Sequence, residues 1–159
     1  MSRSGADLAL LLLAGFRSLV DAARLELAAS GYHDVRAVHD FAMRAIAAGA
    51  DNASELGRQL SVSKQAAAKT IAVLQDRGYV TREPDPTDGR RKHLHVTPLG
   101  FEVLSKGEAI FNELRNQWQQ KIGIAQLQQL EKHLAELVSS SSIRLDTPGW
   151  MAQDLGEEV

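Results

Sequence analysis

SVSKQAAAKTIAVLQDRGYVTREPDPTDGRRKHLHVT, residues 61–97, is the stretch that decides the fold. Its first half has the three-to-four spacing of an amphipathic helix over 64–77, with Ala67 and Ile71 on the apolar face. The preceding run ASELGRQL, residues 53–60, predicts a shorter helix that begins after a capping residue. Two short helices joined by so tight a turn are typical of a helix-turn-helix.

The second half of the stretch predicts a β-hairpin. Residues 79–83 and 92–97 alternate between apolar and polar side chains, as half-buried strands do. The eight residues 84–91 between them form a polar loop longer than a tight hairpin needs. We therefore expect a protruding wing beside the second helix of the helix-turn-helix.

Charge is unevenly distributed along the chain. The net charge is -2, but residues 58–92 hold eight Lys or Arg against four Asp or Glu, so this segment carries +4 and the remainder -6. A local excess of cations on one segment favours a polyanionic partner, and the overall charge does not exclude one. A surface helix suits the DNA major groove, and a cationic hairpin suits the minor groove.

Composition restricts the other function classes. The chain has no cysteine, which excludes disulfides, thiolate metal sites and thiol switches, and cytoplasm is the expected compartment. The apolar run 8–16 is too short to cross a bilayer and continues as a helical pattern, so no membrane partner is expected, with secretion as the minor alternative. No catalytic constellation or phosphate-binding glycine loop is present, and we expect neither an enzyme nor a cofactor.

Apolar helices flank the helix-turn-helix on both sides. Their apolar faces exceed what a small winged helix can cover, which predicts a homodimer with two-fold symmetry and a pseudo-palindromic DNA site. The further helices are expected over 5–29, 35–48, 98–121 and 124–138.

The expected DNA contacts lie on the outer face of the second helix and at the wing. Ala68 allows close approach, and Gln65 and Lys69 can reach base edges or phosphates. In the wing, a carboxylate two residues before Arg90 is expected to orient its guanidinium for the minor groove. The full expected set is Ser63, Lys64, Gln65, Ala68, Lys69, Asp88, Arg90, Arg91 and His93.

The run from Glu55 to Gly100 closely resembles the winged-helix segment of the MarR (multiple antibiotic resistance regulator) family. The Asp-x-Arg of the family's wing is matched by Asp88 and Arg90, and its Val-Thr-x-x-Gly by Val96, Thr97 and Gly100. The flanking helices match in number and order. The resemblance implies a homodimer with one recognition helix in each major-groove half-site and one wing in each flanking minor groove.

These observations predict a mainly α protein with a small β-hairpin wing (α+β), a winged helix-turn-helix with N- and C-terminal dimerisation helices. A single MarR-like domain is expected over residues 1–159. Within it we expect a helical dimerisation region at 5–31 plus 98–143, a DNA-binding region at 34–97 with its recognition helix at 63–77 and its wing at 84–92, and a tail at 144–159 of unassigned role.

The function expected is sequence-specific binding of double-stranded DNA as a transcription regulator, a repressor by resemblance, released or modulated by a small molecule. The family places its effector pocket between the dimer helices and the winged helix, where the candidate lining residues are Arg17, His39, Phe41 and Trp118. Each of these four suits a core or surface position equally well. Two alternatives remain: a winged helix that binds an acidic protein, and a metal-responsive regulator, although no set of metal ligands is predicted.

Overall fold

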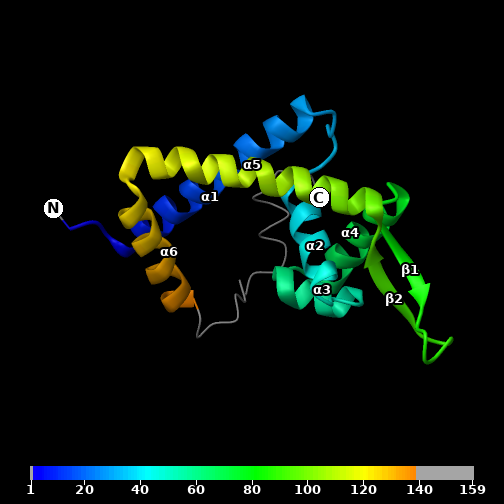
Figure 1. Ribbon diagram of the computed structural model, residues 1–159. Helices are drawn as coiled ribbons and strands as arrows, with labels where there is room; N and C mark the ends of the chain where they lie inside the picture. The colour runs from blue at the N-terminus through cyan, green and yellow to red at the C-terminus, as the bar shows by residue number, and fades with distance from the viewer. Residues whose placement is uncertain (1, 139–159) are drawn as a thin grey trace.

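One long helix, α5 (Pro98–Ile122), runs from the base of the hairpin to the far end of the molecule (Figure 1). The computed structural model describes residues 2–138. Residues 139–143 of the expected dimerisation region and the whole expected tail, 144–159, lie outside the described residues. Along α5, the N-terminal and C-terminal helices gather at one end, and the winged helix lies at the other (Figure 1).

The predicted fold class is confirmed, because the described chain is mainly helical with one antiparallel hairpin. The order of elements is α1 (Gly5–Ala29), α2 (Ala37–Ala47), α3 (Ala53–Leu60), α4 (Lys64–Asp76), β1 (Val80–Pro84), β2 (Lys92–Val96), α5 and α6 (Ile124–Val138).

Helix starts follow the capping chemistry of the sequence. The side chain of Thr97 accepts a hydrogen bond from the N–H of Gly100, and Pro98 occupies the first turn of α5. At α3, the side chain of Asn52 accepts from the N–H of Glu55. The Glu55 carboxylate reaches the N–H of Asp51 rather than that of the cap residue, so the expected reciprocal capping box is displaced by one residue.

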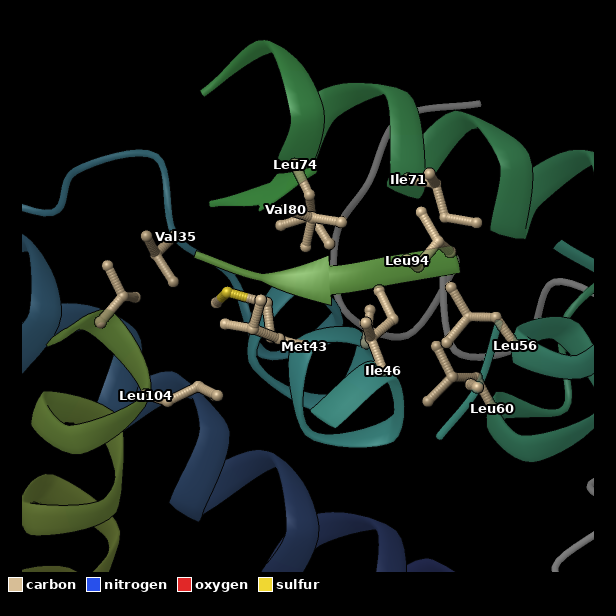
Figure 2. Packing of buried hydrophobic residues seen from close by; sticks show 14 of the residues in the cluster. Val35, Met43, Ile46, Leu56, Leu60, Ile71, Leu74, Val80, Leu94 and Leu104 are labelled. Carbon is tan, nitrogen blue, oxygen red and sulfur yellow. The ribbon is translucent and has the colours of Figure 1, made fainter. Parts of the chain in front are cut away.

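The hairpin completes the core of the winged helix. Val80 pairs with Val96, and their side chains are buried together with Leu94. Figure 2 shows β2, the strand that carries Leu94, between α4 on one side and the helices α2 and α3 on the other. Helix α4 contributes Ile71 and Leu74 to this core. The hairpin is therefore fixed to the helix-turn-helix by apolar packing, and its position relative to α4 is set by the core.

The three-to-four spacing of Val38, Phe41 and Ala45 predicts one inner face for α2. Val38 is buried, whereas Phe41 and Ala45 are only half-buried. The charged Asp40 is also buried, at 1% exposed. The reason is that α2 is packed against α1, α3, α4, α5 and the hairpin, so its burial is not confined to one stripe.

Large apolar side chains stay exposed at the end of the molecule away from the hairpin. The predicted stripe of α6 is mostly uncovered in one chain, because Leu127 is its only buried member within the described residues. No helix in the part of the chain that the structure describes is long and apolar enough to cross a membrane. The exposed set comprises Leu8, Leu10, Leu11, Leu12, Ile122, Ile124, Leu130, Leu137 and Val138.

Candidate nucleic-acid interface

The turn between α3 and α4 brings their backbones into close approach. Ser61 adopts a left-handed conformation with φ of 55°, and the N–H of Val62 donates to the carbonyl of Gly57 at 3.0 Å. A Cβ on Gly57 would lie 2.9 Å from the Val62 carbonyl oxygen, so only glycine fits here without a shift of backbone. The tight turn holds α4 across α3 in the helix-turn-helix arrangement.

The outer face of α4 is open along its length. Ala67, Thr70, Ile71 and Leu74 are buried on the inner side. The side chain of Ser63 accepts from the N–H of Ala66 at 3.0 Å and thus serves as the N-cap. The predicted contact residues Lys64, Gln65, Ala68 and Lys69 are all exposed on the outer side.

The wing tip is held by carboxylate contacts to its own backbone. Asp88 Oδ1 accepts from the N–H of Arg90 at 3.1 Å, and the Asp88 carbonyl accepts from the N–H of Arg91 at 3.0 Å. In the structure this carboxylate accepts from the backbone of Arg90, the donor that so short a side chain reaches first. Both arginine side chains are exposed at the tip.

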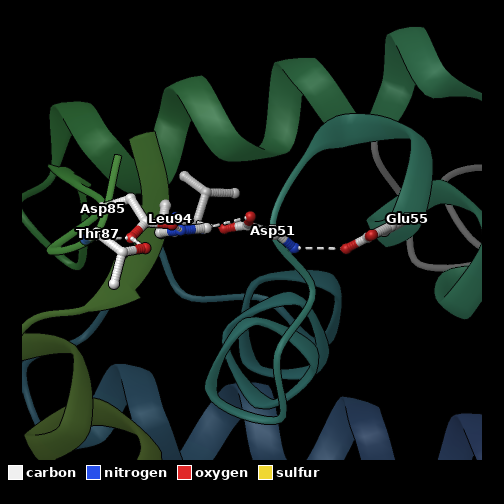
Figure 3. Close-up of polar contacts among 6 residues, drawn as sticks. Asp51, Glu55, Asp85, Thr87 and Leu94 are labelled. Atoms are coloured by element: carbon white, nitrogen blue, oxygen red, sulfur yellow. Dashed lines mark hydrogen bonds and ion pairs between the residues drawn. The ribbon is translucent and has the colours of Figure 1, made fainter. Parts of the chain in front are cut away.

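His93 lies half-buried between two carboxylates. Its Nδ1 lies 2.5 Å from Asp51 Oδ2, and its Nε2 lies 2.6 Å from Asp85 Oδ2. Figure 3 shows Asp51 and Asp85 approaching from opposite sides, one from the loop before α3 and one from the wing. Both ring nitrogens, one of which the expected phosphate contact would use, are occupied by this bridge.

The bridge shifts the pKa values of its members. The hydrogen bonds to Asp85 and then to Asp51 raise the pKa of His93 above its ordinary value. The hydrogen bond from His93, followed by those from Thr87, holds the pKa of Asp85 far below the usual range. Although partial burial acts the other way, the contacts with His93 and with the N–H of Leu94 lower the pKa of Asp51.

One cation of the basic segment has a structural role. Arg77 Nη1 donates to the carbonyl oxygen of Asp34 at 2.7 Å and lies 3.5 Å from His39 Nδ1. It therefore ties the end of α4 to the segment before α2. The remaining basic side chains of the segment are exposed, namely Arg58, Lys64, Lys69, Arg82, Arg90, Arg91 and Lys92.

The four candidate effector residues lie at separate places. His39 is buried, its Nδ1 accepts from the N–H of Arg36 at 3.0 Å, and burial, with the nearby Arg77 and Arg36, lowers its pKa to about 4. Arg17 is half-buried on α1. Phe41 lies between Phe16 and Phe111, with ring centroids 6.4 Å and 6.3 Å away.

Of the four, Trp118 lines a groove, a space of about 330 Å³ between α1, α5 and α6. Arg115 crosses the groove wall to Glu131, with Nε to Oε1 at 2.6 Å. The remaining lining is mostly apolar: Leu19, Phe111, Asn112, Leu127, Leu130 and Leu134. Among the described residues there is no group of three His, Asp or Glu placed to hold a metal ion.

Comparison with known proteins adds to this geometry. Residues 41–91 match the model of the MarR family. The HTH-type transcriptional regulator BilQ of Clostridioides difficile (strain CD3) is 28% identical over 81 residues, which are 51% of this chain and 55% of that protein. The chain spans about a third to about half of the length of the curated relatives it matches.

Solved structures share the fold over most of the chain. FabT of Streptococcus pneumoniae in complex with DNA has a TM-score of 0.70 at 17% identity, covering 86% of this chain and 96% of FabT. CouR of Rhodococcus jostii RHA1 bound to p-coumaroyl-CoA has a TM-score of 0.67 at 19% identity, covering 86% of this chain and 95% of CouR.

The arrangement of α3, α4 and the hairpin defines a winged helix-turn-helix protein. The resemblance to the MarR family is confirmed, by the family model over the winged helix and by the fold over the flanking helices. The curated relatives that the chain matches in part are named as transcription regulators.

Proposed function

We propose that this chain binds double-stranded DNA as a sequence-specific transcription regulator. The observation that carries the proposal is the presence of two exposed surfaces in one chain: the outer face of α4 and the cationic tip of the wing. Small and polar side chains on α4 permit approach to base edges, and Arg90 and Arg91 suit a narrow minor groove. FabT, which shares the fold, was solved in complex with DNA.

The proposed DNA contacts are those expected from the sequence, except for His93, whose ring nitrogens face Asp51 and Asp85, and Asp88. Lys64, Gln65, Ala68 and Lys69 supply the helix face. Ser63, whose hydroxyl caps α4, contributes through the free N–H groups of the helix start rather than through its side chain. Asp88 shapes the turn that presents the two arginines.

A homodimer follows from the exposed apolar side chains. Leu8, Leu10, Leu11 and Leu12 on α1 are each close to half exposed or more, and the apolar stripe of α6 lies at the same end of the molecule. Water-exposed apolar surface of this extent marks an interface. Two copies joined there would set their recognition helices about one DNA turn apart, roughly 34 Å.

Repression and effector control complete the proposal. A bound dimer that blocks a promoter is released when a small molecule favours a spacing of the recognition helices that fits DNA poorly. CouR shows that one protein of this fold binds p-coumaroyl-CoA. In this chain, the groove beside Trp118 has the volume and the apolar lining of a site for a small ligand. A regulator of this kind acts in the cytoplasm.

The deciding experiment is DNA binding as a function of salt. The DNA flanking the gene of this protein is titrated with the full chain at several salt concentrations, beside an unrelated duplex of equal length. We expect a sequence preference and a steep loss of affinity as salt rises. Equal affinity for both duplexes would overturn the proposal. Tight binding to an acidic protein, without binding to either duplex, would support the protein-interaction alternative.

A further inference from the structure

Three segments that are distant in the sequence meet at His93. Asp51 belongs to the connection between α2 and α3, Asp85 to the wing loop, and His93 to β2. The ring nitrogens lie 2.5 Å and 2.6 Å from the two carboxylates. The apolar core fixes the base of the hairpin, whereas this bridge lies closer to its tip, beside Pro84 at the end of β1.

Each carboxylate of the bridge extends further into its own segment. Asp51 Oδ1 accepts from the N–H of Leu94, and the N–H of Asp51 donates to Glu55 at the start of α3. Asp85 Oδ1 accepts from both the N–H and the hydroxyl of Thr87 at 2.7 Å. A continuous set of hydrogen bonds therefore joins the helix-turn-helix to the loop that carries the wing arginines.

The bridge is complete in only one protonation state of the ring. A neutral imidazole has one N–H and one lone pair, so it can donate to one carboxylate and must point its lone pair at the other. The imidazolium has two N–H groups and can donate to both. With both nitrogens within hydrogen-bond distance of a carboxylate oxygen, the geometry is that of the charged ring.

We propose that His93 is a positioning residue for DNA binding, whose charged form ties the wing to the helix-turn-helix through Asp85 and Asp51 and whose deprotonation frees the wing loop. This inference rests on the proposed function, because it deepens the role of the wing. It assigns the ring no contact with DNA. Its consequence is that the reach of Arg90 and Arg91 depends on pH.

The charged groups around His93 set the pH range. Asp51 and Asp85 face it from two segments, His95 lies edge-on at 6.5 Å on the same strand, and Glu83 is its cross-strand partner. The bridge stabilises the wing below the raised pKa of His93 and is lost as pH rises through that value. At the acid end it is lost as pH falls through the lowered pKa values of the two aspartates.

The test combines NMR of the free protein with DNA binding, both from about pH 6 to about pH 9, where an imidazole titrates. In the free protein, we expect the His93 ring to titrate above the ordinary histidine value. We also expect the amides of Thr87 and Arg91 to lose protection against hydrogen exchange, relative to an unstructured chain at the same pH, once the ring is neutral. In the binding arm, affinity should fall above the His93 pKa by at most about tenfold per pH unit for each wing.

His93→Gln removes the titrating ring, and Asp85→Asn removes one carboxylate but keeps the histidine. Both should flatten the pH dependence of DNA binding and weaken binding at low pH. His95→Gln is the matched control, since it deletes the neighbouring ring but none of the hydrogen bonds of the bridge, and it should keep the wild-type slope. Thermal unfolding of each variant shows whether the winged helix is intact, and if His93→Gln is unfolded, Asp85→Asn carries the test.

The two arms separate this inference from the proposed function. If no duplex is bound at any pH, the proposed function fails, and the NMR arm still decides whether His93 ties the wing. The inference is overturned, whether or not DNA binds, if the His93 ring titrates at its ordinary value and the exchange protection of the wing amides does not change with pH. Equal pH slopes for the wild type and for an intact His93→Gln or Asp85→Asn variant overturn it as well.

Discussion

The carboxylate of Asp40 on α2 lies against Gly107 on α5, so close that a Cβ on the glycine would be 2.5 Å from Asp40 Oδ1. The same carboxylate accepts from Arg44 Nε at 2.6 Å, and Arg44 Nη1 reaches Glu108 on α5 at 2.6 Å. Helix α5 therefore meets the winged helix through a buried, ion-paired carboxylate.

Gly107→Ala should destabilise the fold by about 1–3 kcal/mol, because the added methyl group displaces a buried, ion-paired carboxylate. Urea unfolding measures the loss. Gly5→Ala is the matched control, since nothing lies within 4 Å of a Cβ there, and it should change stability by a few tenths of a kcal/mol at most. Equal stability of the two variants would show that Asp40 can move aside.

Arg44→Ala should cost about 1–3 kcal/mol at neutral pH, because it leaves the Asp40 carboxylate buried without its cation. Burial raises the pKa of Asp40, with Arg44 partly offsetting this, so the ionised carboxyl costs folding free energy as pH rises through that pKa. The loss in the variant should therefore shrink at acidic pH. Lys132→Ala, which removes an exposed pair on α6, should have little effect at either pH.

His39 predicts a separate loss of stability in acid. Its pKa is lowered from 6.5 to about 4, chiefly by burial, so the unfolded chain binds the proton more tightly than the folded one. The neutral His39 side chain makes its full contribution to the free energy of unfolding above the ordinary histidine pKa. This contribution falls as pH drops toward about 4. We expect His39→Gln to flatten this part of the stability profile in chemical denaturation. His33→Gln, at an exposed position nearby, should leave the profile unchanged.

Arg90→Ala should weaken DNA binding by about 1–3 kcal/mol per wing and lower its salt dependence, while the dimer and the fold stay intact. Fluorescence anisotropy at two salt concentrations measures both effects. Lys132→Ala removes one positive charge on α6, away from the α4 face and the wing that we propose to contact DNA, and controls for net charge. If both variants bind DNA like the wild type, the wing has no part in binding.

Leu130→Glu should convert the proposed dimer into a monomer, because it places a charge on the exposed apolar stripe of α6 that we assign to the interface. Sedimentation equilibrium at micromolar concentration reports the change. Lys132→Glu introduces a negative charge two residues away, on the opposite side of α6, and should remain a dimer. A wild-type monomer under these conditions would contradict the proposed assembly.

Much of the fold was predictable because local rules dominate it. The start and end of α1 and the start of α5 at Pro98 match the sequence-based prediction, since caps and apolar spacing act within a few residues. The burial of Asp40 was not predictable, because it depends on Arg44 and on a glycine of another helix. Local periodicity places a charged residue outside and carries no information about such a partner.

The candidate site shows the same division. The exposed face of α4 followed from the period of its apolar residues. The role of His93 did not, because Asp51 is 42 residues away in the sequence and only the folded hairpin brings the two together. The contact of His93 with Asp85 was easier to anticipate, since Asp85 lies in the predicted wing loop, only eight residues before His93. The backbone contact of Asp88 shows that adjacency alone does not decide which donor a carboxylate meets.

The uninterrupted length of α5 gives the molecule a mechanical property. At 25 residues the helix is a rod about 37 Å long, rooted at one end among α1 and α6 and at the other beneath the hairpin. Turning such a rod by about 5° at one end carries the other end through about 3 Å. Small rearrangements at the apolar end thus arrive at the wing as displacements comparable to the length of a hydrogen bond.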